Sequence, residues 1–134
     1  MTTPALPALH HVALTVTDLD ASIAWYGRVF GITFQMEGPH EGGTGMLLAD
    51  PAWRFIIVLH RHDANQAERF AETRTGLDHV GFSVATRAEL EAWQRHLEAL
   101  DVPQSPIADT PYGSILVFRD PDNIQLEMYS PPGS

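Results

Sequence analysis

The chain has 134 residues and a formal net charge of −9, with 44% hydrophobic and 19% charged residues. This is the composition of one folded domain that buries roughly two-thirds of its unfolded surface, and it excludes a disordered or bilayer-spanning chain. All eight basic residues are arginines and there is no cysteine, which disfavours nucleic-acid binding and excludes Schiff-base and thiol chemistry.

The first half of the chain alternates strand and helix signals. A β-branched, alternating strand is expected at about 10–16, and Thr17-Asp18 then offers an N-cap to a helix from about 19 to 30, which Gly31 ends. Turn signals at Gly38-Pro39, Gly42-Gly43 and Asp50-Pro51 separate three further predicted strands, which lie at about 32–38, 45–49 and 54–61.

The second half repeats this order. A polar stretch at about 63–76, partly helical in pattern, is interpreted as a linker. The elements predicted after it are a strand at 78–84, a helix at 87–100 that begins after Thr86, a weak strand at 104–109, and strands at 114–119 and 124–130.

The two halves are also similar in sequence. His11-Val-Ala-Leu-Thr-Val16 matches His79-Val-Gly-Phe-Ser-Val84, 68 residues later (79 − 11), and Trp25 matches Trp93 at the same separation. An internal repeat of this kind indicates two copies of one supersecondary unit. We therefore expect an α+β fold of two βαβββ modules, about 8–62 and about 77–131, within a single domain covering 1–134.

Two histidines occupy matched places in this repeat. Because side chains alternate along a strand, His11 shares a face with Ala13 and Thr15, and His79 shares a face with Gly81 and Ser83. Small side chains beside a histidine leave the space that a bound ligand needs.

The last predicted strand carries a carboxylate. Gln125, Glu127 and Tyr129 share one face of that strand, so Glu127 lies at its centre. A buried carboxylate needs a partner or a metal, because desolvating an unpaired one costs several kcal/mol. Two histidines and one carboxylate make up the ligand set of non-haem metal sites that keep open positions for substrate. His11, His79 and Glu127 are the candidate metal ligands.

These motifs resemble a known superfamily. The phrases from His11 to Tyr26, from Gly76 to Val84 and from Tyr112 to Tyr129 are similar to the vicinal oxygen chelate superfamily, which includes glyoxalase I, bleomycin resistance proteins and extradiol dioxygenases. The resemblance implies two modules that form a cupped mixed sheet, and a homodimer in which the ligands of one site come from one chain or from two. It also implies that the first and last strands hold one divalent ion, Fe(II), Mn(II), Zn(II) or Ni(II), on the three residues named above.

The fourth family ligand position departs from the glyoxalase I pattern. Alignment places either Ile57 or Val58 there, and no Asp or Glu lies between Pro51 and His62. The carboxylate that serves glyoxalase I as ligand and base is therefore missing, and the remaining set resembles that of extradiol dioxygenases and fosfomycin-type transferases. His60 faces the site only if Val58 holds the fourth position, which would make it a candidate acid–base group or a replacement ligand; otherwise it is a surface histidine at the end of a strand.

The remaining predictions concern one tyrosine near the site and three histidines at the surface. Tyr129 is a second candidate catalytic residue, because it shares a strand face with Glu127. His40 and His62 are expected in turns and His96 on a polar helix, all three at the surface.

The function expected from these residues is a divalent-metal-dependent enzyme that chelates adjacent oxygens of a small molecule. It would be dioxygenase- or transferase-like rather than glyoxalase I. The alternative is a metal-free binding protein of the bleomycin-resistance type. Residues 1–7 offer neither a basic start nor an apolar stretch of signal-peptide length, so the expected location is cytoplasmic, with neither nucleic acid nor membrane as partner.

Overall fold

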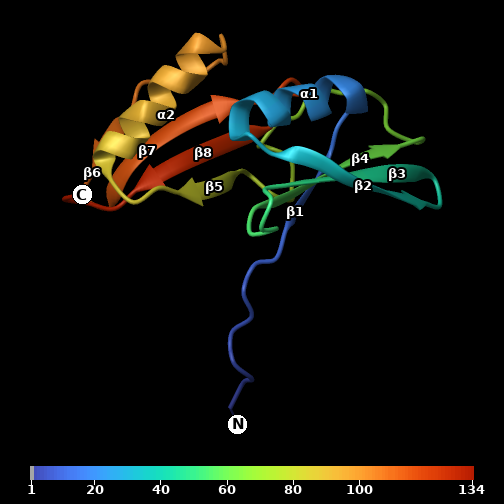
Figure 1. Cartoon of the computed structure of the whole chain (residues 1–134), viewed down its shortest axis with the longest axis horizontal. Helices are drawn as coiled ribbons and strands as arrows, with labels where there is room; N and C mark the ends of the chain where they lie inside the picture. Colours follow the sequence, from blue (N-terminus) through green and yellow to red (C-terminus); the bar gives the residue numbers. More distant parts are fainter. Residues whose placement is uncertain (1) are drawn as a thin grey trace. The chain divides into compact units, whose positions relative to one another are not determined.

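The computed structural model describes residues 2–134, which form two compact units. The first unit ends at Asn65 and the second runs from Gln66 to Ser134, so the boundary falls inside the predicted linker. Each unit contains one helix and one four-stranded sheet (Figure 1). The paired α+β modules predicted from the repeat are therefore confirmed, with a separate mixed sheet in each.

The first unit has the element order β-α-β-β-β. Its sheet order is β1-β4-β3-β2, with β1 parallel to β4 and the other neighbours antiparallel. The elements are β1 (Val12–Thr15), α1 (Leu19–Phe30), β2 (Thr33–His40), β3 (Gly43–Ala49) and β4 (Ile56–His62).

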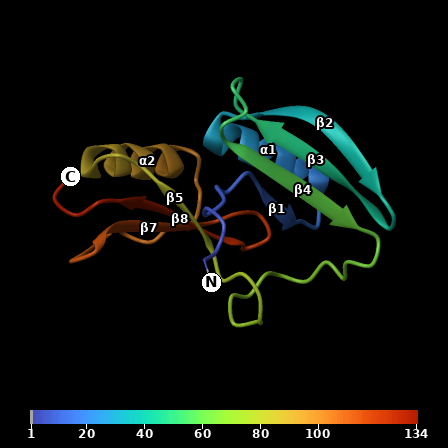
Figure 2. The ribbon, with the colours of Figure 1, turned by 90° about the horizontal axis from the view of Figure 1, so that it is seen from below.

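Helix α1 covers one face of this sheet (Figure 2). Asp18 caps its first turn, accepting a hydrogen bond from the Ala21 N–H at 3.1 Å, and Gly31 ends it at a left-handed φ of 71° that favours glycine. The buried side of α1 carries Tyr26, which is fully buried. Helix α1 contacts β3 and β4, whose residues Leu48, Ile57 and Leu59 are buried.

The second unit repeats the arrangement with sheet order β5-β8-β7-β6, in which β5 runs parallel to β8. Thr86 accepts from the Glu89 N–H at 3.1 Å, and the Glu89 carboxylate accepts from the N–H of Ala85, the residue before the N-cap, at 2.8 Å, so that both contacts stabilise the start of the helix. The elements are β5 (Val80–Ser83), α2 (Arg87–Ala99), β6 (Ala108–Thr110), β7 (Gly113–Arg119) and β8 (Gln125–Ser130).

Several predicted elements differ from the structure; the strands expected at 10–16 and 78–84, for example, are shorter and begin only after His11 and His79. The strand expected to end at residue 38 continues to His40, because Pro39 lies in an edge strand where its missing N–H is tolerated. Residues 63–76 contain no helix. The weak strand expected at 104–109 is reduced to Ala108–Thr110, and Gln104 makes only an isolated bridge with Phe118.

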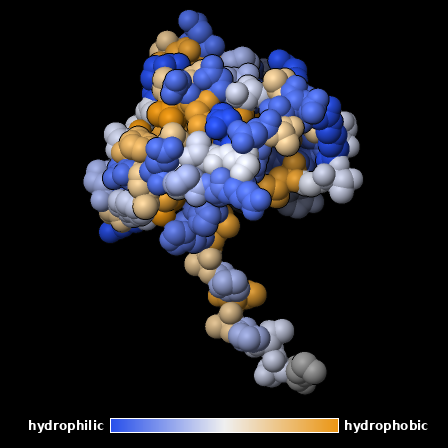
Figure 3. Space-filling view, turned by 90° about the vertical axis from the view of Figure 1, so that its right-hand side faces the viewer, coloured by the Kyte–Doolittle hydropathy of each residue, from blue (hydrophilic) through white to orange (hydrophobic). Residues whose placement is uncertain are grey.

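The segment before β1 is extended and exposed. Leu6 is 93% exposed and Leu9 is 83% exposed, and Figure 3 shows hydrophobic residues along the extended N-terminal segment. Neither helix of residues 2–134 has the length and apolar character needed to cross a bilayer.

Candidate functional site

His79 and Glu127 lie together in the second unit. His79 directly precedes β5, and Glu127 is at the centre of β8, where it pairs with Gly81. The Nε2 atom of His79 is 3.3 Å from Oε2 of Glu127. The side chain of Glu127 is 18% exposed and that of His79 is 42% exposed, so both are accessible from one face of the sheet.

The other ring nitrogen of His79 is held by its neighbour. Nδ1 lies 2.8 Å from Oδ1 of Asp78, to which the ring N–H donates. This contact fixes the tautomer, so that a neutral ring presents its lone pair at Nε2, toward Glu127. Carboxylate–histidine pairs of this kind commonly orient histidine ligands in metal sites.

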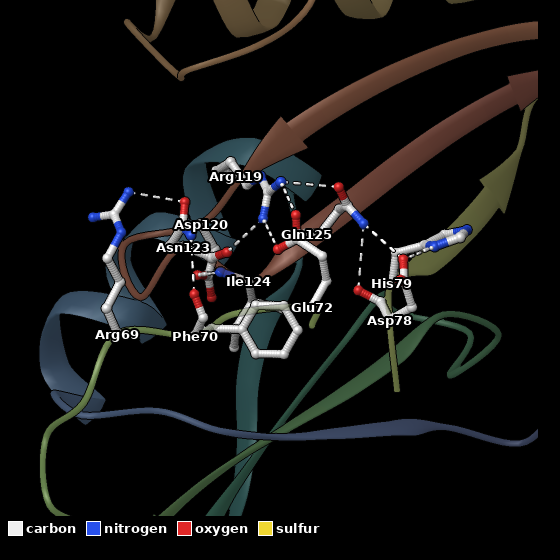
Figure 4. A network of polar contacts seen from close by, with 10 residues as sticks. All are labelled: Arg69, Phe70, Glu72, Asp78, His79, Arg119, Asp120, Asn123, Ile124 and Gln125. Carbon is white, nitrogen blue, oxygen red and sulfur yellow. Dashed lines mark hydrogen bonds and ion pairs between the residues drawn. The ribbon is translucent and has the colours of Figure 1, made fainter. Parts of the chain in front are cut away.

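A polar network extends from Asp78 across the ends of β7 and β8 (Figure 4). Gln125 donates to Asp78 at 2.8 Å and accepts from Arg119 at 2.9 Å. Arg119 also donates two hydrogen bonds to Glu72, at 3.0 and 3.1 Å. Hydrogen bonding to Arg119 lowers the pKa of Glu72 from an ordinary value of 4.5 to about 2. The orientation of His79 is thus linked to the loop that carries Glu72.

The same loop is anchored at the β7–β8 turn. Asn123 has a positive φ of 67°, a conformation that asparagine tolerates in turns. Its side chain donates to the Phe70 carbonyl at 3.0 Å and accepts from Arg69 at 2.9 Å (Figure 4). These contacts hold the residues before His79 in place without a helix.

The separation of His79 and Glu127 fits a shared metal ion. Metal–nitrogen and metal–oxygen bonds of about 2.0–2.2 Å, at angles between octahedral and tetrahedral, put two ligand atoms about 2.8–3.6 Å apart. The observed 3.3 Å lies within that range. One imidazole nitrogen and one carboxylate oxygen form a donor set that suits iron, manganese, zinc or nickel.

Space for a ligand adjoins this pair. A Cβ atom added at Gly81 would meet no atom within 4 Å, so the face beside Glu127 is open. A groove of about 400 Å³ lies along the neighbouring strand β7, lined by Val117, Arg119 and Gln125 but not by His79 or Glu127; Val117 pairs with Glu127 across the sheet. Pockets for small molecules usually begin at roughly 300 Å³.

Tyr129 shares the strand face of Glu127, as predicted. Its hydroxyl donates to the Tyr112 carbonyl at 2.8 Å, and its ring lies against Gly113. The hydroxyl of Tyr129 is therefore already engaged in a hydrogen bond, and proton transfer from it would first require this hydrogen bond to break.

In the first unit, His11 directly precedes β1, the place that His79 holds before β5. The ring is exposed, and its Nδ1 lies 2.9 Å from Nδ1 of His10. His10 therefore contacts the candidate ligand, although the alternation of the strand predicts that it faces away.

The strand register identifies the fourth position. Val58 pairs with Ala13 in the first unit, as Glu127 pairs with Gly81 in the second. Ile57 is 1% exposed and belongs to the core. Val58 is therefore the counterpart of Glu127, and the same register makes His60 the counterpart of Tyr129.

The profile of the Glyoxalase/Bleomycin resistance protein/Dioxygenase superfamily matches residues 8–128. The chain belongs to this superfamily. A crystal structure of a glyoxylase/bleomycin resistance protein/dioxygenase domain from Frankia sp. EAN1pec is 35% identical, with a TM-score of 0.85 over 95% of this chain and 99% of that one.

Two further proteins that are similar to this chain carry more specific names. MhqA of Bacillus subtilis, named as a candidate ring-cleaving dioxygenase, is 27% identical over 87% of this chain and 37% of its own length. A mutant of the fosfomycin resistance protein FosX from Listeria monocytogenes, solved with manganese(II) and a dihydroxypropylphosphonic acid, is 20% identical, with a TM-score of 0.67 over 96% of each chain. The FosX likeness establishes the fold alone.

One group of side chains in this superfamily member was not expected from the sequence. His60 lies with His40 and His62, which were predicted to be separate surface residues in turns. Burial, followed by the neighbouring His40, His62 and His11, lowers the pKa of His60. The signal that could have revealed the cluster is the His-x-His spacing of residues 60 and 62, which places both rings on one face of a strand.

Proposed function

We propose that the protein is a divalent-metal-dependent enzyme of this superfamily, dioxygenase- or transferase-like rather than glyoxalase I. The observation that carries the proposal is the 3.3 Å separation of His79 Nε2 and Glu127 Oε2, with the opposite ring nitrogen held by Asp78. His11 is proposed as the third ligand, because it holds the matching place in the repeat.

When bound, the ion would act as a Lewis acid on two adjacent oxygens of a small substrate. The residues of the chain have separate tasks in this proposal. Glu127 contributes negative charge, Asp78 keeps the His79 ring in its ligating tautomer, and Gly81 leaves room beside both. The groove along Val117 and Gln125 would hold the remainder of the substrate.

The choice of reaction class rests on Val58. Its aliphatic side chain occupies the place of Glu127 in the repeat, and it can neither bind a metal nor accept a proton. Three protein ligands leave positions open for a bidentate substrate and a further reactant, which suits ring cleavage or group transfer more than proton-transfer isomerisation. The name of MhqA, a candidate ring-cleaving dioxygenase, also favours ring cleavage.

The first test is metal content. His79→Ala, Glu127→Ala and His11→Ala should each lower the bound metal by about one ion per chain, because each removes one of three ligands. His96→Ala, on α2, is the matched control and should change nothing. Metal content that is unchanged in His79→Ala would contradict the assignment, and metal-free protein that binds small molecules would support the bleomycin-resistance alternative.

The second test is the requirement for oxygen. Protein loaded with Fe(II) or Mn(II) should consume dioxygen with catechol- or hydroquinone-type substrates, and His79→Ala should abolish this consumption. Anaerobic turnover of a hemithioacetal would overturn the reaction class. We further propose a homodimer that works on its small-molecule substrate in the cytoplasm.

A further inference from the structure

Three histidines of the first unit point toward one another on one side of its sheet. His40 ends β2, and His60 and His62 lie on β4, with β3 between the two strands. The ring centroid of His40 is 5.1 Å from each of the other two, which are 5.8 Å apart. One ring nitrogen from each residue lies within 4.8 Å of the others.

Two glycines of β3 make this arrangement possible. Gly43 pairs with both His40 and His62, and Gly45 pairs with His60. Since neighbouring strands lie about 4.8 Å apart, rings from β2 and β4 can meet only by leaning over β3. A Cβ atom on Gly45 would lie 2.8 Å from Cε1 of His60, whereas one on Gly43 would first clash with the Arg61 carbonyl oxygen and would also lie 2.8 Å from Cε1 of His40.

The hydrogen bonds of His40 prepare it as a ligand. Its Nδ1 lies 3.0 Å from the Glu41 carbonyl, to which it donates, so a neutral ring carries its lone pair on Nε2. That Nε2 is 3.1 Å from Nδ1 of His60. Two nitrogens bound to one tetrahedral ion at about 2.0–2.1 Å lie about 3.3–3.4 Å apart, so the pair needs little movement to share an ion.

We propose that His40, His60 and His62 form a second metal site, which binds a divalent late transition-metal ion such as zinc, nickel or cobalt. Three imidazole nitrogens and no carboxylate make up the donor set. Imidazole suits these ions, whereas magnesium, calcium and manganese prefer oxygen ligands. Three protein ligands leave a fourth position for water or a small anion.

This site goes beyond the proposed function, since none of its ligands belongs to the His11, His79 and Glu127 set. A simple hydrogen bond between His40 and His60 would account for their 3.1 Å contact. Such a hydrogen bond gives no role to His62, which is exposed and lies on the same strand face as His60. Removal of His62 therefore separates a metal site from a hydrogen-bonded pair.

The experiment uses the full-length chain without a histidine tag, stripped of metal and titrated with cobalt(II). Tetrahedral cobalt absorbs visible light far more strongly than octahedral cobalt, so the three-histidine site is distinguishable from a site with one carboxylate and several waters. We expect strong absorption in the unmodified protein. His62→Ala and His60→Ala should each weaken the affinity of the strongly absorbing site by more than about 100-fold, since even loss of an outer partner costs 10- to 100-fold.

Two controls make the result decisive. His96→Ala removes a histidine elsewhere and should leave the titration unchanged. Because His62 is exposed, its variant should keep the circular dichroism spectrum of the parent. Unchanged affinity in folded His62→Ala, or cobalt bound without the tetrahedral absorption, would overturn the proposal.

The test of the second metal site can be distinguished from the test of the proposed function. In the double variant His79→Ala with Glu127→Ala, the strongly absorbing ion should remain while the other ion is lost. If the proposed function fails, His79→Ala will leave total metal unchanged, and His62→Ala will still remove the tetrahedral cobalt. Loss of the tetrahedral signal in the double variant, with retention in His62→Ala, would contradict a second site.

Discussion

The carboxylate of Asp78 lies 2.8 Å from Nδ1 of His79, on the side of the ring opposite to Glu127. Asp78→Ala should therefore lower metal affinity by about 10- to 100-fold without abolishing it, because the ring loses its orientation and keeps its ligating nitrogen. Isothermal titration calorimetry measures the change. Asp78→Asn is the matched control, and it should lose less metal affinity because the amide oxygen can still accept the hydrogen bond. Equal metal affinity in Asp78→Ala and the parent would argue against a role of Asp78 in orienting His79.

A carboxylate at position 58 should behave differently from one at position 57. Val58 is half-buried on the open strand face, whereas Ile57 is 1% exposed in the core. Val58→Glu should fold and raise metal affinity by adding a fourth ligand. Ile57→Glu should lower the free energy of unfolding by about 3–5 kcal/mol, as an uncompensated buried charge does. Urea unfolding and metal titration of both variants measure these effects, and a stable Ile57→Glu protein would show that the register is wrong.

The ion pair of Glu72 with Arg119 should make stability depend on pH. Arg119 lowers the pKa of Glu72 from 4.5 to about 2 in the folded protein. The stabilisation from this ion pair is therefore fully present above the pKa that Glu72 has in the unfolded chain, and it is lost as the pH falls through the pKa in the folded protein. The stability difference between the parent and Glu72→Gln should be larger near neutral pH than at about pH 2. Urea unfolding at both pH values measures it, with Glu68→Gln on the same loop as control. A difference that does not change with pH would rule out this linkage.

The chain should form a homodimer at micromolar concentration. Strand β2 is an edge strand whose side chains are exposed along nearly its whole length, with Phe34 at 50% and Met36 at 51%. Exposed apolar edges invite pairing with a second chain. Light scattering measures the mass, and Phe34→Ser with Met36→Ser should weaken association if this edge is the contact. A monomeric parent protein would contradict the prediction.

Most of the fold could be predicted because two independent signals agreed. Alternation and capping signals located the elements, and the match of His11 with His79 paired them into two modules. The long-range hydrogen bonds could not be predicted. Arg119 was one of several indistinguishable arginines in the sequence, and its contacts with Glu72 and Gln125 depend on strand ends and a loop that no periodic pattern describes.

The histidine cluster was missed for a specific reason. Gly38-Pro39 and Gly42-Gly43 were both interpreted as turns, which placed His40 outside the sheet. In the structure the turn is shorter, with Gly42 at a φ of 81°, and both His40 and Gly43 are strand residues that pair with each other. Glycine in a strand can mark a close approach by other groups, and here it marks the place where imidazole rings cross β3.

Gly45 also bears on how the sequence can change over evolution. The three atoms nearest to a Cβ at this position all belong to the ring of His60, so the two residues constrain each other. Gly45→Ala should displace the ring and disturb the parent protein, yet should be tolerated once His60 is replaced by alanine. A double-mutant cycle on stability would measure that coupling. Among homologous chains, we expect glycine here to persist where histidine persists at 60 and to drift where it has been lost.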